Sequence, residues 1–400
     1  MLVGKTIVLG VTGGIAAYKS VELLRLLTKS GATVHVVMTK SAAEFLTPLT
    51  FQTLSGNPVH LDLFNLIAEQ EIGHISLADR ADLFVIAPAT ANFIGKVANG
   101  IADDMLTTTV MATKAPVLIA PAMNCNMYAN PVYRQNEKRL RDCGYCFVDP
   151  VKGQLACGWE GDGKMQDPSV ICEAAMSVLT KQDLAGETVL VTAGPTREEL
   201  DPVRFISNHS SGKMGYAVAR IAQRRGATVI LVSGPTCLPP PYGVETVRVM
   251  TAIEMRDAVV SRLQDATIVV KSAAVADYRP VKRADSKVKK GAGFLVIELE
   301  KNPDILAEIG AMKKGQIIAG FAAETEDLLE NAKKKLEEKN LDMIVANDVG
   351  EPGAGFDLDT NIVRIIYRGG KVEEPGLMSK DDLAGLILDR VMGLKGQQNG

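Results

Sequence analysis

The sequence predicts an α/β protein of two domains, each built on a parallel sheet with helices on both faces. Three observations lead to this prediction. Short apolar runs alternate with amphipathic segments along the chain, which is the pattern of repeated strand–helix–strand units. Both halves open with the same strand–turn–helix–strand plan. The length of 400 residues allows two or three domains at roughly 100–200 residues each.

The first forty residues predict the first of these units. Residues 5–11 form a short apolar run, which is typical of a buried parallel strand. A glycine turn follows at 12–14, and apolar residues then recur three or four positions apart, which predicts a helix from Ile15. Gly31 ends that helix, and residues 32–38 predict the next strand.

The second half repeats this plan. Residues 188–193 predict a strand, and a helix is expected over about 216–225. The polar segment 181–187 separates the halves. We therefore expect one domain over residues 1–186 and another over 187–400.

Further apolar runs extend both predicted sheets. The additional strands are expected at residues 83–87, 117–120, 246–249, 267–272, 316–320 and 342–345, and helices at 252–263 and 326–339. Alternation of this kind gives parallel sheets covered on both faces, and ligands bind outside the carboxyl ends of such strands.

Composition excludes several classes of protein. With 46% apolar and 23% charged residues, the chain is neither disordered nor fibrous. A net charge of −3 and 5% aromatic residues argue against nucleic-acid binding. No apolar run reaches the roughly 18 residues of a membrane span, and glycines interrupt the short apolar run near the N-terminus. Six cysteines are too few for a disulfide scaffold, so we expect a cytoplasmic protein.

Three motifs of the first half lie where parallel strands end. Residues 12–16 suit a phosphate at a helix start, although they do not match GxGxxG and could equally be a tight turn. Residues 88–92 and 121–124 place small polar groups after prolines. Such groups suit an uncharged heteroaromatic ring, and turn formation with helix capping is the alternative. His74, in a glycine-containing loop, is the candidate general acid or base.

Two cysteine motifs have different interpretations. Cys157 lies in a glycine-rich stretch long enough to be a lid, where a cysteine could donate a proton. An ordinary surface loop is the alternative. Cys143 and Cys146 form a single CxxC pair, and a tetrahedral zinc site would need a second pair, so we interpret this pair as structural.

Charged and hydroxyl residues mark the second half. Residues 207–213 combine hydroxyls, glycine and lysine before a helix, which suits a phosphate without matching a P-loop. Asp277 follows a strand and could help to hold Mg²⁺ on a triphosphate. The lysine-rich stretch 287–290 follows it. The lysines at 333–335 and 339, together with Glu337 and Glu338, by themselves indicate a solvated, salt-bridged helix.

Six of these strings, taken in order, resemble one family. They are residues 13–19, 121–124, 156–158, 207–214, 273–278 and 320–325. The family is the bifunctional flavoprotein of coenzyme A biosynthesis, in which a phosphopantothenate–cysteine ligase is fused to a phosphopantothenoylcysteine decarboxylase. The resemblance covers nearly the whole chain and implies two Rossmann-like three-layer domains, of which the N-terminal one is flavodoxin-like.

For the N-terminal domain, the resemblance implies an FMN-dependent decarboxylase. FMN would take up electrons from the cysteine moiety before CO₂ leaves. Asn124 would hold the substrate carboxylate, His74 would assist the decarboxylation and Cys157 would donate the final proton. One departure is Tyr128, where the family often has tryptophan. The residues implied at the FMN site are Gly13, Gly14, Ile15, Ala16, Thr39, Thr90, Asn92 and Met123.

For the C-terminal domain, the resemblance implies a ligase that uses CTP and Mg²⁺ through an acyl-cytidylate. Asn208 would bind the acyl intermediate, Lys287 would neutralise the reacting phosphate and Asp277 would hold the metal. The residues implied at the CTP site are Lys271, Ser272, Ala273, Asp277, Lys287, Pro303, Asp304, Ile305, Leu306, Phe321, Lys335 and Lys339. The family also implies a homo-oligomer built from trimers of the N-terminal domain and dimers of the C-terminal domain.

Two alternatives stay open from the sequence. One is a nicotinamide-dependent reductase with two Rossmann-like halves, against which the missing GxGxxG fingerprints count. The other is a regulatory subunit that binds a flavin nucleotide without turnover, against which the presence of His74, Asn124 and Cys157 counts.

Overall fold

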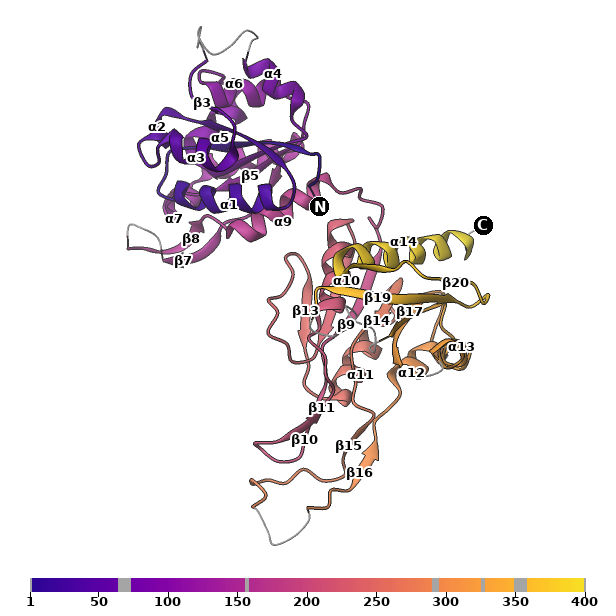
Figure 1. Ribbon diagram of the computed structural model, residues 1–400. Coiled ribbons are helices and arrows are strands. Elements are labelled where there is room, and N and C mark those ends of the chain that lie inside the picture. Colours follow the sequence, from indigo (N-terminus) through magenta and orange to yellow (C-terminus); the bar gives the residue numbers. More distant parts are fainter. Residues whose placement is uncertain are drawn as a thin grey trace. The chain divides into compact units, whose positions relative to one another are not determined.

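The computed structural model describes residues 2–63, 73–154, 158–289, 295–324, 328–348 and 358–398. The chain divides into two compact units, Met1–Thr180 and Lys181–Gly400 (Figure 1). Each unit is described by itself below.

A parallel sheet of six strands forms the centre of the first unit. The strands lie in the order β3-β2-β1-β4-β5-β6. Without the two-residue edge strand β3, this order is the 2-1-3-4-5 order of flavodoxin, so the predicted flavodoxin-like fold is confirmed. The strands are β1 (Thr6–Val11), β2 (Thr33–Met38), β3 (Val59–His60), β4 (Leu83–Ala89), β5 (Val117–Pro121) and β6 (Cys146–Phe147).

Helices cover both faces of this sheet because alternate strand residues face opposite sides. Within β1, Leu9 joins the cluster beneath one set of helices and Val8 the cluster beneath the other. The first set is α1 (Ala17–Lys29), α3 (Pro48–Ser55) and α9 (Pro168–Leu179). The second set is α4 (Gly73–Arg80), α5 (Ala91–Ala98), α6 (Met105–Ala112) and α8 (Pro131–Asp142).

Three smaller elements complete the first unit. The short helices α2 (Lys40–Ala43) and α7 (Cys125–Ala129) follow β2 and β5. An antiparallel hairpin of β7 (Val151–Gln154) and β8 (Glu160–Lys164) packs against α7. The predicted proton donor Cys157 belongs to the hairpin's connecting loop and lies outside the described residues.

The second unit contains a nine-stranded sheet in the order β13-β12-β9-β14-β17-β18-β19-β20, with β21 beside β19. It is parallel from β13 to β18 and antiparallel beyond, so the prediction of an entirely parallel sheet is wrong at this edge. The strands are β9 (Thr188–Ala193), β12 (Thr228–Ser233), β13 (Glu245–Arg248), β14 (Ile268–Lys271), β17 (Ile317–Glu324), β18 (Met343–Asp348), β19 (Thr360–Tyr367), β20 (Val372–Glu373) and β21 (Leu377–Ser379).

Helices again cover both faces of this sheet. On one face, α10 (Lys213–Arg224) and α14 (Lys380–Gln398) share one apolar cluster with the sheet. On the other face, α11 (Ala252–Arg262), α12 (Ile305–Ala311) and α13 (Leu328–Glu338) do the same. The three-layer architecture predicted for this domain is therefore confirmed.

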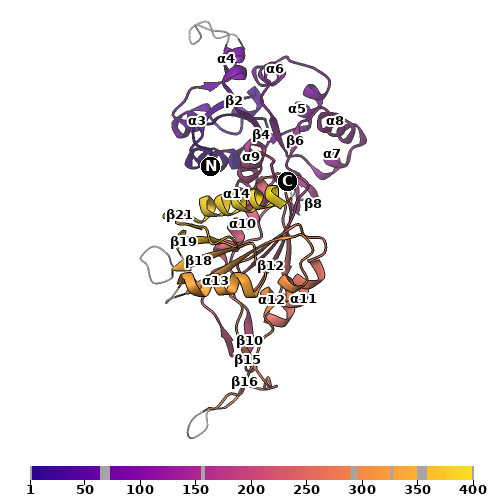
Figure 2. The same cartoon turned by 90° about the vertical axis from the view of Figure 1, so that its right-hand side faces the viewer.

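A long arm projects from the second unit, as Figures 1 and 2 show. It consists of two antiparallel ladders, β10 (Arg197–Glu199) with β11 (Phe205–Ser207) and β15 (Tyr278–Pro280) with β16 (Leu299–Lys301). No pattern in the sequence had predicted this arm. Within the described residues, no helix combines the length and apolar character needed to cross a membrane.

Candidate active sites

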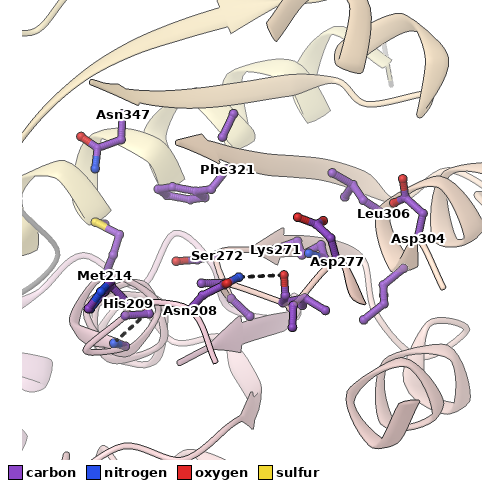
Figure 3. A pocket seen from close by; sticks show the side chains of 18 of the residues that line it. Asn208, His209, Met214, Lys271, Ser272, Asp277, Asp304, Leu306, Phe321 and Asn347 are labelled. Carbon is purple, nitrogen blue, oxygen red and sulfur yellow. Dashed lines mark hydrogen bonds between the residues drawn. The ribbon is translucent and has the colours of Figure 1, made fainter. Parts of the chain in front are cut away.

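A large pocket of about 1010 Å³ opens in the second unit at the carboxyl ends of β14, β17 and β18 (Figure 3). Three segments supply most of its lining, namely residues 208–214, 271–278 and 301–306. This is the edge at which doubly wound sheets bind ligands. The pocket gathers Asn208 and every residue predicted for CTP except Lys287, namely Lys271, Ser272, Ala273, Asp277, Pro303, Asp304, Ile305, Leu306, Phe321, Lys335 and Lys339.

The segment after β14 is fixed by hydrogen bonds to the end of β9 and the segment after it. The backbone N–H of Ala273 donates to the hydroxyl of Thr192 at 3.1 Å, and that of Ala276 donates to the hydroxyl of Thr196 at 3.0 Å. Between them, the N–H of Ala274 donates to the carbonyl of Gly194 at 3.0 Å. This wall of the pocket is therefore rigid where β9 and β14, the two strands at the reversal of strand order, lie side by side.

Asn208 lies against this wall (Figure 3). Its side-chain NH₂ donates to the carbonyl of Val275 at 3.0 Å. The preceding hydroxyl, Ser207, donates to the carbonyl of Thr196 at 2.7 Å. Because the amide nitrogen of Asn208 is held by the protein, its carbonyl oxygen is the atom that can accept from a ligand.

The start of α10 depends on two glycines. Gly212, its N-cap, has a φ of 78°, a left-handed conformation that favours glycine. A Cβ at Gly215 would lie 2.8 Å from the carbonyl oxygen of Thr192 and 2.6 Å from the Cβ of Ala193. These glycines let the helix begin directly against the end of β9, with no side chain capping its first turn.

Lysines dominate the charge of the pocket. Six lysines and two aspartates are among its described lining residues. The Lys339 ammonium lies 2.8 Å from the carboxylate of Asp304. Burial alone would raise the pKa of Asp304, but the hydrogen bonds from Lys339 and from the N–H of Ala307 hold it below its usual value. Burial lowers the pKa of Lys271 to about 8, against the opposing attraction of Asp304.

Lys287 does not line this pocket. It is exposed and lies in the arm, between β15 and β16. Of the lysine-rich stretch 287–290, Lys290 lies outside the described residues.

Sequence reasoning also missed lining residues from the antiparallel edge. Asn347 at the end of β18, Asn361 in β19 and Lys380 at the start of α14 all face the pocket. Nothing in a single sequence marks them, because β19 reaches the pocket only after the chain reverses direction.

In the first unit, the residues predicted for a flavin follow four neighbouring parallel strands. Residues 13–16 follow β1, Thr39 follows β2, Thr90 and Asn92 follow β4, and Met123 follows β5. Since the carboxyl ends of parallel strands share one edge of the sheet, the fold brings these segments together.

The loop after β1 presents a set of backbone hydrogen-bond donors. Within the described residues, the backbone N–H groups of residues 13–16 donate to no protein acceptor. The Thr12 hydroxyl fixes the loop by donating to the carbonyl of Pro88 at 2.8 Å and accepting from the N–H of Thr90 at 3.0 Å. A Cβ at Gly13 would lie 2.3 Å from that of Ser41, so only glycine fits. Free N–H groups at a helix start bind phosphate, and this loop therefore fits the phosphate of a flavin nucleotide.

Asn124 is the N-cap of α7, and its carbonyl oxygen accepts from the N–H of Asn126 at 2.8 Å. Its NH₂ group is thereby the part that can donate to a ligand. The β7–β8 hairpin lies directly against it, because the N–H of Met123 donates to the carbonyl of Gly163 at 3.0 Å. Strand β8 is therefore held beside Asn124.

His74 lies in the first turn of α4, the helix that precedes β4. Its Nδ1 is buried and has no hydrogen-bond partner among the described residues. The described residues contain no group of three His, Cys, Asp or Glu side chains that could hold a metal ion.

Comparison with known proteins assigns both units. Residues 1–180 match the Flavoprotein family model, and residues 184–394 match the C-terminal domain of the DNA/pantothenate metabolism flavoprotein. The coenzyme A biosynthesis bifunctional protein CoaBC of Bacillus subtilis is 50% identical over 99% of both chains. That of Escherichia coli is 47% identical over 100% of this chain and 99% of its own.

Among solved structures, the C-terminal domain of a CoaBC protein is 47% identical. The match covers 54% of this chain and all of that one, with a TM-score of 0.47. A mutant PPC decarboxylase complexed with pantothenoylaminoethenethiol is 34% identical. That match covers 43% of this chain and 96% of the other, with a TM-score of 0.39.

The protein is therefore an enzyme of the flavoprotein class, with a second Rossmann-like domain that belongs to pantothenate metabolism. The chain belongs to the family of coenzyme A biosynthesis bifunctional proteins, and it carries the phosphopantothenoylcysteine decarboxylase and phosphopantothenate–cysteine ligase activities of that family. This outcome confirms the resemblance found in the sequence and removes the reductase and the regulatory subunit as alternatives.

Proposed function

We propose that the pocket of the second unit is the ligase site and that CTP is its activating nucleotide. The carboxylate of 4′-phosphopantothenate attacks the α-phosphorus of CTP, which gives an acyl-cytidylate and pyrophosphate. The amine of L-cysteine then attacks the acyl carbon and releases CMP. The observation that carries this proposal is the excess of lysines over aspartates in the lining, because both substrates bring phosphate groups that need cationic partners.

The pocket wall that begins at Lys271 suits a nucleotide. Phe321, Leu306 and Ile305 supply apolar contacts, and Lys335 with Lys339 supply charge one helical turn apart on α13 and just beyond it. We assign this wall to CTP. Asn208, whose carbonyl oxygen can accept, is assigned to the acyl intermediate, which carries hydroxyl and amide donors.

We assign Mg²⁺ to Asp277. A lone carboxylate suits Mg²⁺, which keeps several waters and takes its other ligands from substrate phosphates. Lys287 is assigned to the charge that develops on the reacting phosphate. Since Lys287 lies outside the pocket, its arm must move towards the pocket or the lysine must come from a second copy of the chain.

We assign decarboxylation to residues 1–186 and ligation to residues 187–400, with FMN as the flavin of the first domain. The free N–H groups of residues 13–16 would hold its phosphate, and Thr39, Thr90, Asn92 and Met123 would line the rest of its site. When bound, FMN supplies a reversible two-electron acceptor, which stabilises the electron pair left by departing CO₂.

The catalytic residues of the first domain act on the substrate itself. The Asn124 NH₂ group donates to the substrate carboxylate and orients it. The buried Nδ1 of His74 has no protein partner in the described part of the chain and is available for proton transfer. Cys157 is proposed as the final proton donor on the basis of the family resemblance alone.

The arm supports the proposal that the second domain forms dimers. Its exposed apolar side chains include Val203, Phe205, Val281, Val296 and Leu299, and clustered apolar surface marks interaction sites. Trimers of the first domain are proposed from the family alone. Because CTP and phosphorylated pantothenate are intracellular metabolites, we place the enzyme in the cytoplasm.

One incubation tests the whole proposal. The purified chain, loaded with FMN, receives 4′-phosphopantothenate, L-cysteine, CTP and Mg²⁺. Mass spectrometry should find CMP, phosphopantothenoylcysteine and 4′-phosphopantetheine, together with pyrophosphate. Ligation with ATP but not CTP would reject the nucleotide assignment, and accumulation of phosphopantothenoylcysteine without any 4′-phosphopantetheine would reject the FMN assignment.

A further inference from the structure

Asp201 is a buried carboxylate in the turn between β10 and β11, with only 1% of its surface exposed. One oxygen accepts from the N–H groups of Val203 at 2.8 Å and Arg204 at 2.9 Å. The other accepts from the Arg204 guanidinium at 2.6 and 3.0 Å and from the N–H of Val288 at 3.2 Å. The Arg204 hydrogen bonds hold the pKa of Asp201 well below its usual range, so the group is ionised at neutral pH.

The hydrogen bond from Val288 to Asp201 connects the turn to a segment far away in sequence. Arg204 makes a second hydrogen bond to the same residue by donating to the carbonyl of Val288 at 3.0 Å. Nearby, the N–H of Ala284 donates to the carbonyl of Leu200 at 2.9 Å. The turn therefore binds residues 284–288 through hydrogen bonds at both ends of that segment. Asp201 is the charged group among these contacts.

Lys287 directly precedes Val288, whose backbone is held by Asp201 and Arg204. Its own side chain is exposed, so it is positioned by its backbone rather than by contacts of its ammonium group. We infer that Asp201 is a positioning residue for ligation, because its hydrogen bond to Val288 fixes the backbone from which Lys287 projects. This inference rests on the proposed role of Lys287 at the reacting phosphate.

Closing the turn alone does not require this carboxylate. The N–H of Leu200 already donates to the carbonyl of Arg204 at 2.9 Å, and burial of a charge is costly unless every oxygen is satisfied. What Asp201 adds is the connection to Val288. Neither Asp201 nor residues 284–288 line the pocket, so the CTP site itself does not depend on them.

The test is Asp201→Asn in the full chain with FMN bound. The amide keeps one acceptor oxygen but loses the charge that holds Arg204 and Val288 together. We expect kcat for ligation to fall at least tenfold while KM for CTP changes less than twofold. Backbone hydrogen exchange of residues 284–289 should accelerate. Decarboxylation of supplied phosphopantothenoylcysteine should be unchanged. A rise in KM for CTP with unchanged kcat, or an unchanged kcat, would overturn the inference.

A double-mutant comparison separates positioning from general structure. If Asp201 acts through Lys287, then Asp201→Asn adds no further loss to Lys287→Gln, measured as slow pyrophosphate release at high enzyme concentration. An equal proportional loss in both backgrounds would reject the inference. Full ligation by Lys287→Gln alone would instead reject the proposed role of Lys287.

The matched control is Glu199→Gln. Glu199 pairs with Arg283 at 2.5 Å in the same part of the arm, but this pair is exposed. Exposed pairs contribute little, so ligation should change less than twofold, and a loss as large as that of Asp201→Asn would reject the specific role of Asp201. If Asp201→Asn does not bind CTP, Asp201→Ser replaces it, because a serine hydroxyl can still accept from the N–H groups of the turn. The same criteria then apply to Asp201→Ser.

Discussion

At the scale of single residues, helix capping fixes which end of Asn124 meets the substrate. Its carbonyl oxygen accepts from the N–H of Asn126, and its NH₂ group is the end of the side chain that can donate to a carboxylate. Asn124→Asp keeps the cap, since aspartate caps as well as asparagine, but turns a donor into a second negative charge. We expect kcat/KM for phosphopantothenoylcysteine to fall by at least about 100-fold, as the loss of a charge-assisted hydrogen bond plus repulsion implies.

The control for this substitution is thermal unfolding of the same variant. Because the cap is kept, the melting temperature should stay within about 2 °C of the parent, given that a change of 1 kcal/mol moves it by about 2–4 °C in a larger domain. Asn130→Asp, at the N-cap of α8 with the same bond to a following N–H, should leave decarboxylation intact. A normal rate for Asn124→Asp would remove it from carboxylate binding.

Lys271 makes CTP binding depend on pH. Burial lowers its pKa to about 8, while Asp304 and Asp277 attract a proton and Lys339 and Lys335 repel it. A bound triphosphate favours the charged form, so binding takes up a proton near pH 8. Affinity is full below the pKa and falls as the pH rises through it. At pH 9 about one-tenth of the side chains stay protonated, so we expect affinity about tenfold weaker than at pH 7.

Calorimetric titration with CTP at pH 7, 8 and 9 measures this effect. Lys271→Met keeps most of the length of the side chain without the charge, so its affinity should be weaker at pH 7 and nearly constant up to pH 9. Equal pH dependence in both proteins would show that another group titrates.

At the scale of elements, the contact between α10 and β9 places residues 208–214 over the pocket. Gly215 permits this contact, because a Cβ there would meet the backbone of Thr192 and Ala193 at 2.8 and 3.1 Å. Gly215→Ala should lower the free energy of unfolding by about 1–3 kcal/mol, as overpacking does, and should weaken CTP binding as α10 shifts. Chemical denaturation and CTP titration measure the two effects.

Gly385→Ala is the matched control on α14. A Cβ there would meet nothing within 4 Å, and alanine stabilises a helix interior by up to about 1 kcal/mol relative to glycine. This variant should therefore be at least as stable as the parent, with normal CTP binding. Destabilisation equal to that of Gly215→Ala would mean that close packing is not the cause.

The elements that the sequence predicted are those with a strong apolar signal. The predicted strand at 188–193 is buried from Val189 onward, and such continuous apolar runs are readable in sequence. The arm strands β10, β11, β15 and β16 have three residues each and no common buried face, so no period marks them. In β19, buried residues do alternate, and this signal could have predicted the strand.

The residues that line the pocket also divide into those that the sequence could predict and those that it could not. Its wall after β14 could be predicted, because a polar segment after a buried strand is visible in sequence. Lys335 and Lys339 could not, since their spacing on α13 is equally that of an exposed, salt-bridged helix. Only packing of α13 against β17 and β18 brings them to the pocket, and only the family resemblance had suggested it.

At the scale of the whole molecule, each unit has its own core and its own candidate site. The apolar clusters of residues 2–175 and those of residues 184–391 share no residue. A substitution in one site should therefore leave the chemistry of the other unchanged. Asn124→Asp should retain ligation, and Lys287→Gln should retain decarboxylation of supplied phosphopantothenoylcysteine.

Mixing these two variants tests whether the intermediate passes through solution. Neither chain alone should convert 4′-phosphopantothenate to 4′-phosphopantetheine. Together they should do so after a lag, because phosphopantothenoylcysteine made by one chain must accumulate before the other consumes it. Doubling the concentration of the Lys287→Gln chain alone should shorten the lag. Adding an excess of a chain that carries both substitutions should not shorten it. If the mixture forms neither 4′-phosphopantetheine nor free phosphopantothenoylcysteine, while Lys287→Gln decarboxylates phosphopantothenoylcysteine when it is supplied, then the intermediate stays on the chain that makes it and the two units do not work independently.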